Sequence, residues 1–147
     1  MDYAKSFAIS AAGMDIERTR VDVAALNLAN ANTVQTPDGL AYRPLTVLAR
    51  LSPASAPAGF SDQIDQGVDR AMLMLPQTEV VPALSKPRSV YEPGNPLADA
   101  KGFISYPGVD IATETVTMMN AQRSYEANVA AMNVTRTLAL KALDIGG

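Results

Sequence analysis

The positions of the prolines constrain this chain of 147 residues more than any other feature. All ten prolines lie between Pro37 and Pro107, and neither flank contains one. Because proline breaks the interior of a helix, long helices are confined to those flanks. We therefore predict a mainly α fold in three parts: an N-terminal helix in residues 1–34, a proline-rich middle region of short strands and turns in 35–109, and a C-terminal helix in 110–147.

The expected helix ends follow from local sequence. The first helix is predicted to run from about Tyr3 to Asn30, because asparagine tolerates the left-handed conformation that ends helices. The second is predicted to start after Asp110, a suitable N-cap residue, with Glu114 in its first turn, and to continue to Asp144. In the middle region, short strands are expected at 45–47, 71–75 and 78–81, where apolar residues alternate or cluster.

Apolar residues recur every seven positions on both predicted helices, a spacing typical of helices that pair as a coiled coil. On the first helix two such series are offset by two residues, which is a rotation of about 200° and places apolar side chains on opposite sides. One series can be buried between two antiparallel helices, and the other then needs a further partner. A self-contained bundle, in which the middle region covers the second face, is the alternative. The predicted subunit interface comprises Phe7, Ile9, Ala11, Met14, Ile16, Val21, Val23, Leu28, Ile111, Met118, Tyr125, Met132 and Leu138.

The composition argues against most catalytic classes. Cysteine and histidine are absent, which removes disulfides, thiolate nucleophiles, zinc fingers and imidazole acid/base chemistry. The net charge of -3 comes from charges of both signs spread along the chain, so no basic surface for nucleic acid is expected. No stretch approaches the roughly 20 apolar residues that span a bilayer, and the residues before Phe7 lack the positive charge of a signal peptide. We therefore expect no catalytic residue, cofactor, metal, small-molecule substrate, nucleic-acid partner, membrane insertion or cleaved signal peptide.

The remaining candidate for chemistry is an acidic cluster of Asp62, Asp65 and Asp69. Close carboxylates can hold a hard cation or act as an acid/base pair. Their spacing does not match a calcium loop, which favours a solvated acidic loop. A small hydrolase or metal-dependent enzyme that uses these carboxylates is the alternative function of a different class.

Three segments resemble the flagellar rod and hook family of axial proteins. The first is ISAAGMDIERTRVDVAALNLANANT, from Ile9 to Thr33, and the second is ETVTMMNAQRSYEANVAAMN, from Glu114 to Asn133. The third, RSVYEPGNPLADAKGFISYPGVD, from Arg88 to Asp110, resembles the proximal-rod members of the family. The segment from Thr46 to Lys86 carries no resemblance. The residues on family motif positions are Asn27, Asn30, Tyr42, Arg43, Tyr91, Pro93, Gly94, Pro96, Asp99, Gly102, Pro107, Arg123, Glu126 and Asn128.

The resemblance implies a structural subunit of the bacterial flagellar basal body that lies in the rod, in the periplasmic space, and transmits torque. It implies export without a cleaved signal peptide through the flagellar type III export apparatus. The implied partners are copies of the chain itself and the rod proteins FlgB, FliE and FlgF. A soluble coiled-coil adaptor, or another member of the rod and hook family, is the alternative.

The segment from Tyr91 to Pro96 is predicted to form a rigid turn that orients the second helix relative to the middle region. Pro93 and Pro96 fix their φ angles near about -65° and restrict the residues before them. Pro93 and Gly94 suit the central pair of a type II turn, in which the glycine takes a positive φ. An ordinary loop that tolerates substitution is the alternative.

Overall fold

The computed structural model describes residues 3–34, 42–51 and 75–146. Within these residues the chain forms two long helices and four short strands, which confirms the predicted mainly α fold with a small β part. The elements are α1 (Tyr3–Asn30), β1 (Leu45–Leu51), β2 (Pro76–Pro82), β3 (Arg88–Tyr91), β4 (Phe103–Tyr106) and α4 (Ile111–Gly146).

Local signals determine the ends of both helices. Asp110 caps α4, since its Oδ1 accepts from the backbone N–H of Ala112 at 3.1 Å and its Oδ2 from the hydroxyl of Thr113 at 2.7 Å. These two hydrogen bonds lower the pKa of Asp110, the one from Thr113 having the larger effect. At the other end of the first helix, the side-chain amide of Asn30 donates to the carbonyl of Leu26 at 2.8 Å, where α1 stops.

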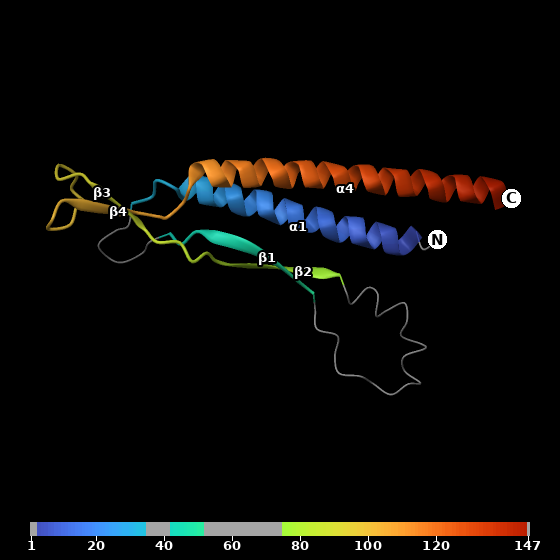
Figure 1. Ribbon diagram of the computed structural model, residues 1–147, viewed down its shortest axis with the longest axis horizontal. Coiled ribbons are helices and arrows are strands. Elements are labelled where there is room, and N and C mark those ends of the chain that lie inside the picture. The colour runs from blue at the N-terminus through green and yellow to red at the C-terminus, as the bar shows by residue number, and fades with distance from the viewer. Residues whose placement is uncertain (1–2, 35–41, 52–74, 147) are drawn as a thin grey trace, which may run out of the picture. The chain divides into compact units, whose positions relative to one another are not determined.

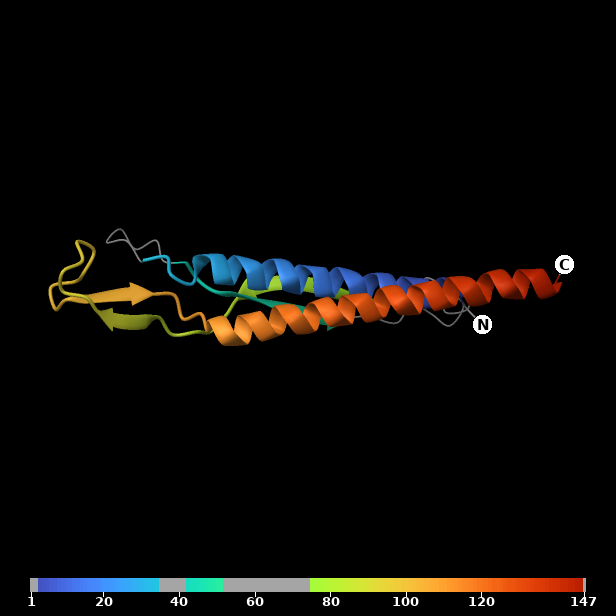
Figure 2. The ribbon, with the colours of Figure 1, turned by 90° about the horizontal axis from the view of Figure 1, so that it is seen from above.

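The chain divides into two compact units, and each contains part of both helices. Within each unit the α1 and α4 parts lie side by side and run in opposite directions (Figures 1 and 2). Unit 1 comprises Met1–Thr19, Leu48–Glu79 and Ala121–Gly147, and unit 2 comprises Arg20–Val47 and Val80–Asn120.

Each unit buries small and β-branched side chains where its elements meet. In unit 1 the buried apolar residues among those described are Ile16 and Ala121. A Cβ at Gly13 would lie 2.9 Å from the side-chain amide of Asn128, so the two helix backbones approach closely there. In unit 2 the buried apolar residues include Val23, Ala24, Ala31 and Ile104.

The strands form two small sheets of two strands each, β1 with β2 and β3 with β4. Arg50 and Glu79 form an exposed ion pair at 3.4 Å between β1 and β2. The strands β3 and β4 are antiparallel, and the buried Ile104 stands opposite Val90. Expected strands at 45–47 and 78–81 fall within β1 and β2, whereas most of the one expected at 71–75 lies outside the described residues.

The predicted type II turn at Pro93 and Gly94 is wrong. The backbone N–H of Asn95 donates to the carbonyl of Glu92 at 3.1 Å, so a turn does form, but Gly94 does not have a positive φ. Pro93 also suits the first central position of a type I turn, which needs no positive φ. The described glycine with a positive φ is Gly102, at 81°, on the opposite side of the β3–β4 loop.

Candidate functional site

A buried asparagine connects three segments of unit 2. Asn27 on α1 is fully buried, at 0% exposure. Its Nδ2 donates to the carbonyl oxygen of Leu45 at 2.8 Å and to Glu114 Oε1 at 3.0 Å. Its Oδ1 accepts from the Leu45 backbone N–H at 2.8 Å and from the Tyr42 hydroxyl at 2.7 Å. Asn27, Tyr42, Leu45 and Glu114 are called the Asn27 network below.

The Asn27 network satisfies all four hydrogen-bonding positions of the side-chain amide, two donors and two lone pairs. Such complete pairing is what allows a polar side chain to be buried without a large desolvation cost. The network also holds the start of β1 against both helices, because Leu45 donates and accepts through its backbone. Burial, and secondarily the nearby Glu114 carboxylate, raises the pKa of Tyr42, so its hydroxyl stays protonated as a donor.

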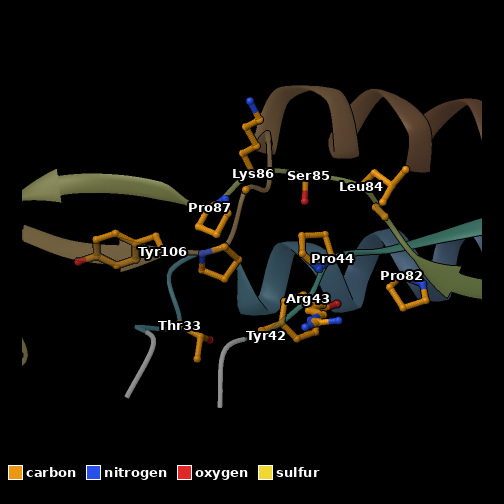
Figure 3. Close-up of a pocket in the computed structure, with 13 residues that line it drawn as sticks. Thr33, Tyr42, Arg43, Pro44, Pro82, Leu84, Ser85, Lys86, Pro87 and Tyr106 are labelled. Atoms are coloured by element: carbon orange, nitrogen blue, oxygen red, sulfur yellow. The ribbon is translucent and has the colours of Figure 1, made fainter. Parts of the chain in front are cut away.

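A groove of about 580 Å³ lies in unit 2 beside this network (Figure 3). Prolines form much of its wall, together with the rings of Tyr42 and Tyr106. Ser85 points toward Pro44 in this view, and its buried Oγ has no hydrogen-bond partner among the described residues. None of the described residues that line the groove carries a carboxylate, so they offer no pair of carboxylates for acid/base chemistry. These lining residues are Thr33, Tyr42, Arg43, Pro44, Pro82, Ala83, Leu84, Ser85, Lys86, Pro87, Tyr106, Pro107 and Gly108.

One side of the groove depends on a tight crossing of two linkers. A Cβ on Gly108 would collide with the carbonyl oxygen of Lys86. The segment before α4 can therefore approach the segment before β3 this closely only with a glycine at position 108. Pro107 next to it is buried. No local sequence pattern predicts this crossing, because the two linkers meet only in the folded chain.

The loop between β3 and β4 is held by a dense set of hydrogen bonds. Asp99 Oδ1 accepts from the backbone N–H groups of Lys101 and Phe103, each at 2.8 Å, and these bonds lower its pKa. The N–H of Glu92 donates to the carbonyl of Gly102 at 2.8 Å. The ring of Tyr91 lies over Gly102, where a Cβ would come within 2.9 Å of it.

The predicted interface residues on α1 differ in burial within the single chain. Ile16 and Val23 are buried, and Ile9 is 54% exposed. Phe7, Met14, Val21 and Leu28 are half-buried, and Ala11 is exposed.

On α4 the heptad series alternates in burial. Met118 and Met132 are half-buried, whereas Ile111 and Tyr125 are exposed. Leu138, which lies outside this series, is exposed too. None of these positions is tested as a contact between subunits, and their assignment to an interface stays a prediction.

The predicted motif residues fall into three groups. Asn27 and Tyr42 meet in the Asn27 network, and Arg43 and Pro107 line the groove. The second group, Tyr91, Pro93, Gly94, Pro96, Asp99 and Gly102, lies in or beside the β3–β4 loop. On α4, Arg123 and Glu126 are exposed, and Asn128 donates to the Ser124 carbonyl at 3.0 Å.

Two important residues were not identified from sequence. The sequence indicates Glu114 only as an acidic residue in the first turn of a helix, because its hydrogen bond to Asn27 spans 87 residues. Gly13 is the single glycine of α1. A glycine inside a helix lowers the stability of the helix by about 1 kcal/mol relative to alanine, so its presence can indicate that another helix packs closely there.

A cluster of acidic side chains could hold a metal ion, and a long apolar helix could cross a membrane. Among the described residues no group of three or more acidic side chains is placed to hold a metal ion. The acidic cluster of Asp62, Asp65 and Asp69 lies outside the described residues. Neither helix, over the part that the structure describes, is apolar enough for long enough to cross a membrane.

Comparison with known proteins identifies the family. Residues 100–145 match the family model described as "Flagellar basal body rod FlgEFG protein C-terminal". The flagellar basal-body rod protein FlgC of Escherichia coli O6:H1 is 39% identical over 140 residues, which cover 95% of each chain. The FlgC proteins of Salmonella typhimurium and Bacillus subtilis are 36% and 33% identical, over 95% and 96% of each chain. The chain therefore belongs to the FlgC family of flagellar basal-body rod proteins.

Proposed function

We propose that this chain is a structural subunit of the proximal rod of the flagellar basal body and has no enzymatic activity. The observation that carries the proposal is the identity of 33 to 39% with FlgC proteins over at least 95% of the chain. In this role the chain assembles through its terminal helices with copies of itself and with FlgB, FliE and FlgF, and it transmits torque through the rod.

The exposed surface supports a role in assembly. Large apolar side chains that are about half exposed or more are spread along α4, among them Val116, Val134, Leu140 and Leu143. Burying apolar side chains of this size against another subunit removes them from water, which favours association. Fully burying such a side chain is worth about 1.5 to 3 kcal/mol, so four of them would contribute substantially to a contact.

The proposal also includes the route to the rod. The chain is exported through the flagellar type III apparatus without a cleaved signal peptide and assembles in the periplasmic space. The division of the chain into an N-terminal helix, a middle region and a C-terminal helix then separates two assembly helices from a segment that contacts the next layer of the rod.

Deletion of the gene, followed by electron microscopy of isolated basal bodies, tests the proposed function. We expect non-motile cells whose basal bodies lack a complete rod, and recovery of both rod and motility when the chain is supplied in trans. An epitope-tagged copy should be found in purified basal bodies. Complete rods in the deletion strain would contradict the proposal, and a purified chain that forms only discrete soluble dimers would favour an adaptor.

A further inference from the structure

The β3–β4 hairpin presents an exposed aromatic pair beside an acid. Tyr91 and Phe103 are cross-strand partners, and their rings lie 5.2 Å apart in a tilted arrangement. The side chains are nevertheless 63% and 42% exposed. Asp99 is fixed next to them by accepting from the N–H of Phe103. Tyr91, Phe103 and Asp99 are called the hairpin patch below.

The hairpin patch is held rigidly although it is exposed. The hydrogen bonds around Asp99 and Gly102 constrain the loop, and the ring of Tyr91 rests on Gly102 with no room for a Cβ. Exposed aromatics on a stiff element lose little conformational entropy on binding, which is why Tyr and Trp are enriched at interface hot spots. The segment from Tyr91 to Phe103 contains two acids, Glu92 and Asp99, against one base, Lys101.

A surface of opposite charge lies on the part of α4 that belongs to unit 1. At 100° per residue, six exposed residues fall within roughly 80° of the helix circumference. They are Arg123, Ala127, Ala130, Val134, Leu138 and Lys141, called the α4 stripe below.

The α4 stripe is basic at both ends and apolar between them. It contains no acid, and Val134 and Leu138 are 59% and 48% exposed. It lies on the side of the helix away from the buried Ala121 and from Asn128, whose side-chain amide lies beside Gly13 of α1.

We infer that the hairpin patch of one copy docks on the α4 stripe of a second copy. The aromatic pair covers Val134 and Leu138, and the acids of the hairpin approach Lys141, which lies less than one turn beyond Leu138. Both surfaces are exposed in the single chain, and their charges are complementary. This inference rests on the proposed function and names one contact of the assembled rod.

The contact is heterologous, because the two surfaces are different parts of the same chain. A heterologous contact does not close on itself in a dimer, so it leads to rings or to open helical arrays, which suits a rod. The hairpin patch offers only two large side chains, far fewer than the 20 to 30 residues per partner, or roughly 800 Å², of a stable interface. The contact is therefore weak in a pair of copies and becomes populated when many contacts act together in the lattice.

The absence of cysteine makes site-specific cross-linking a direct test. Two differently tagged copies are expressed together, one carrying Lys101→Cys beside the hairpin patch and the other Ala130→Cys within the α4 stripe. Basal bodies are isolated and treated with a short bismaleimide. We expect a cross-linked species that carries both tags. Adding Asp99→Asn to the first copy keeps a side-chain oxygen that can accept the hydrogen bonds of the loop, but it removes the negative charge. We expect this change to reduce the yield of the cross-linked species several-fold.

The matched control replaces Ala130→Cys by Asn133→Cys, which is exposed on the same helix about 100° from the middle of the α4 stripe and outside it. We expect at least a fivefold lower yield from this pair. Equal yields, or none from the first pair although both tagged copies are present in basal bodies, would overturn the contact. If neither copy enters basal bodies in motile cells, the proposed function itself fails, and immunoblotting separates these two outcomes.

Discussion

At the scale of single residues, Asn27 differs from every other asparagine that the structure describes. It is fully buried and makes four hydrogen bonds, whereas Asn30 and Asn128 donate to carbonyls of their own helices. Removing a side chain that is buried and fully paired strongly destabilises the fold, because its partners are left buried without a hydrogen bond. Its contribution to stability is therefore far larger than that of the asparagines that pair within their own helix.

Replacing Asn27 with alanine should lower the free energy of unfolding by about 3 kcal/mol or more, since several buried groups lose their partner at about 1 to 3 kcal/mol each. The loss should appear as a lower midpoint in urea unfolding followed by circular dichroism. Asn30→Ala is the control and should change the free energy by less than about 1 kcal/mol. Similar losses in the two variants would show that the Asn27 network contributes little.

The pKa of Tyr42 predicts how stability changes at high pH. Burial and Glu114 raise this pKa above its usual value of 10.0, so the folded state holds the proton more tightly than the unfolded state. The resulting stabilisation is complete below the unfolded pKa and is lost as pH rises through the folded pKa. The free energy of unfolding should therefore fall above about pH 10. In Tyr42→Phe this alkaline decrease should be smaller, and an identical pH profile would contradict the assignment.

Two glycines of the β3–β4 loop should respond differently to alanine. Gly102 has a φ of 81° and no room for a Cβ beneath Tyr91, so Gly102→Ala should destabilise the chain by about 1 to 3 kcal/mol. A Cβ added at Gly94 would meet no atom within 4 Å, and the φ of Gly94 is not positive. Gly94→Ala should be neutral or stabilising by up to about 1 kcal/mol. The reverse order in thermal unfolding would show that Gly94 is the constrained position.

At the scale of elements, the helices could be predicted and their tertiary contacts could not. The start of α4 follows from its N-cap residue Asp110. The end of α1 at Asn30 agrees with the prediction, but no described asparagine takes the left-handed conformation on which that prediction rested. The Asn27 network joins positions 27, 42, 45 and 114, and no local pattern encodes such a combination. The predicted type II turn at Pro93-Gly94 is wrong for a related reason. The same two residues fit a type I turn, and the hydrogen bonds of the folded loop, which no local pattern encodes, select between the two types.

The approach of α1 and α4 at Gly13 can be measured with a double-mutant cycle. Gly13→Ala gains helix propensity of up to about 1 kcal/mol but forces the Asn128 side chain to move. The gain should be larger in an Asn128→Ala background, where the obstacle is absent. The measured quantity is the difference between the two effects on the free energy of unfolding, expected at about 0.5 kcal/mol or more. Simple additivity would mean that the residues do not touch.

At the scale of the whole molecule, the isolated chain exposes much apolar surface on its helices. Ile9 and Leu26 on α1 are 54% and 50% exposed, and Leu143 on α4 is 73% exposed. Helices in water depend on tertiary burial for most of their stability. A subunit of this kind is therefore expected to gain a large part of its order from neighbouring subunits.

Hydrogen exchange should reveal that gain. In a dilute monomer we expect weak protection of the backbone amides over Phe7–Leu28 and Met118–Met132, because these helices lack partners on their exposed sides. In isolated basal bodies the same amides should exchange at least tenfold more slowly. Analytical ultracentrifugation of the dilute sample establishes that it is monomeric. Strong protection in that sample would show that the chain is a self-sufficient bundle.

The hydrogen bond from Asn27 to Glu114 also restricts which alignments of the two helices can form in unit 2. Sliding one helix past the other by a single turn displaces the amide by about 5.4 Å along the axis, beyond hydrogen-bonding reach of Glu114. The heptad repeat alone would tolerate a slip of this kind far better, because it offers similar apolar side chains a turn or two away. Each time the chain folds, a single side chain thus distinguishes the correct alignment of the two helices in unit 2 from a shifted one.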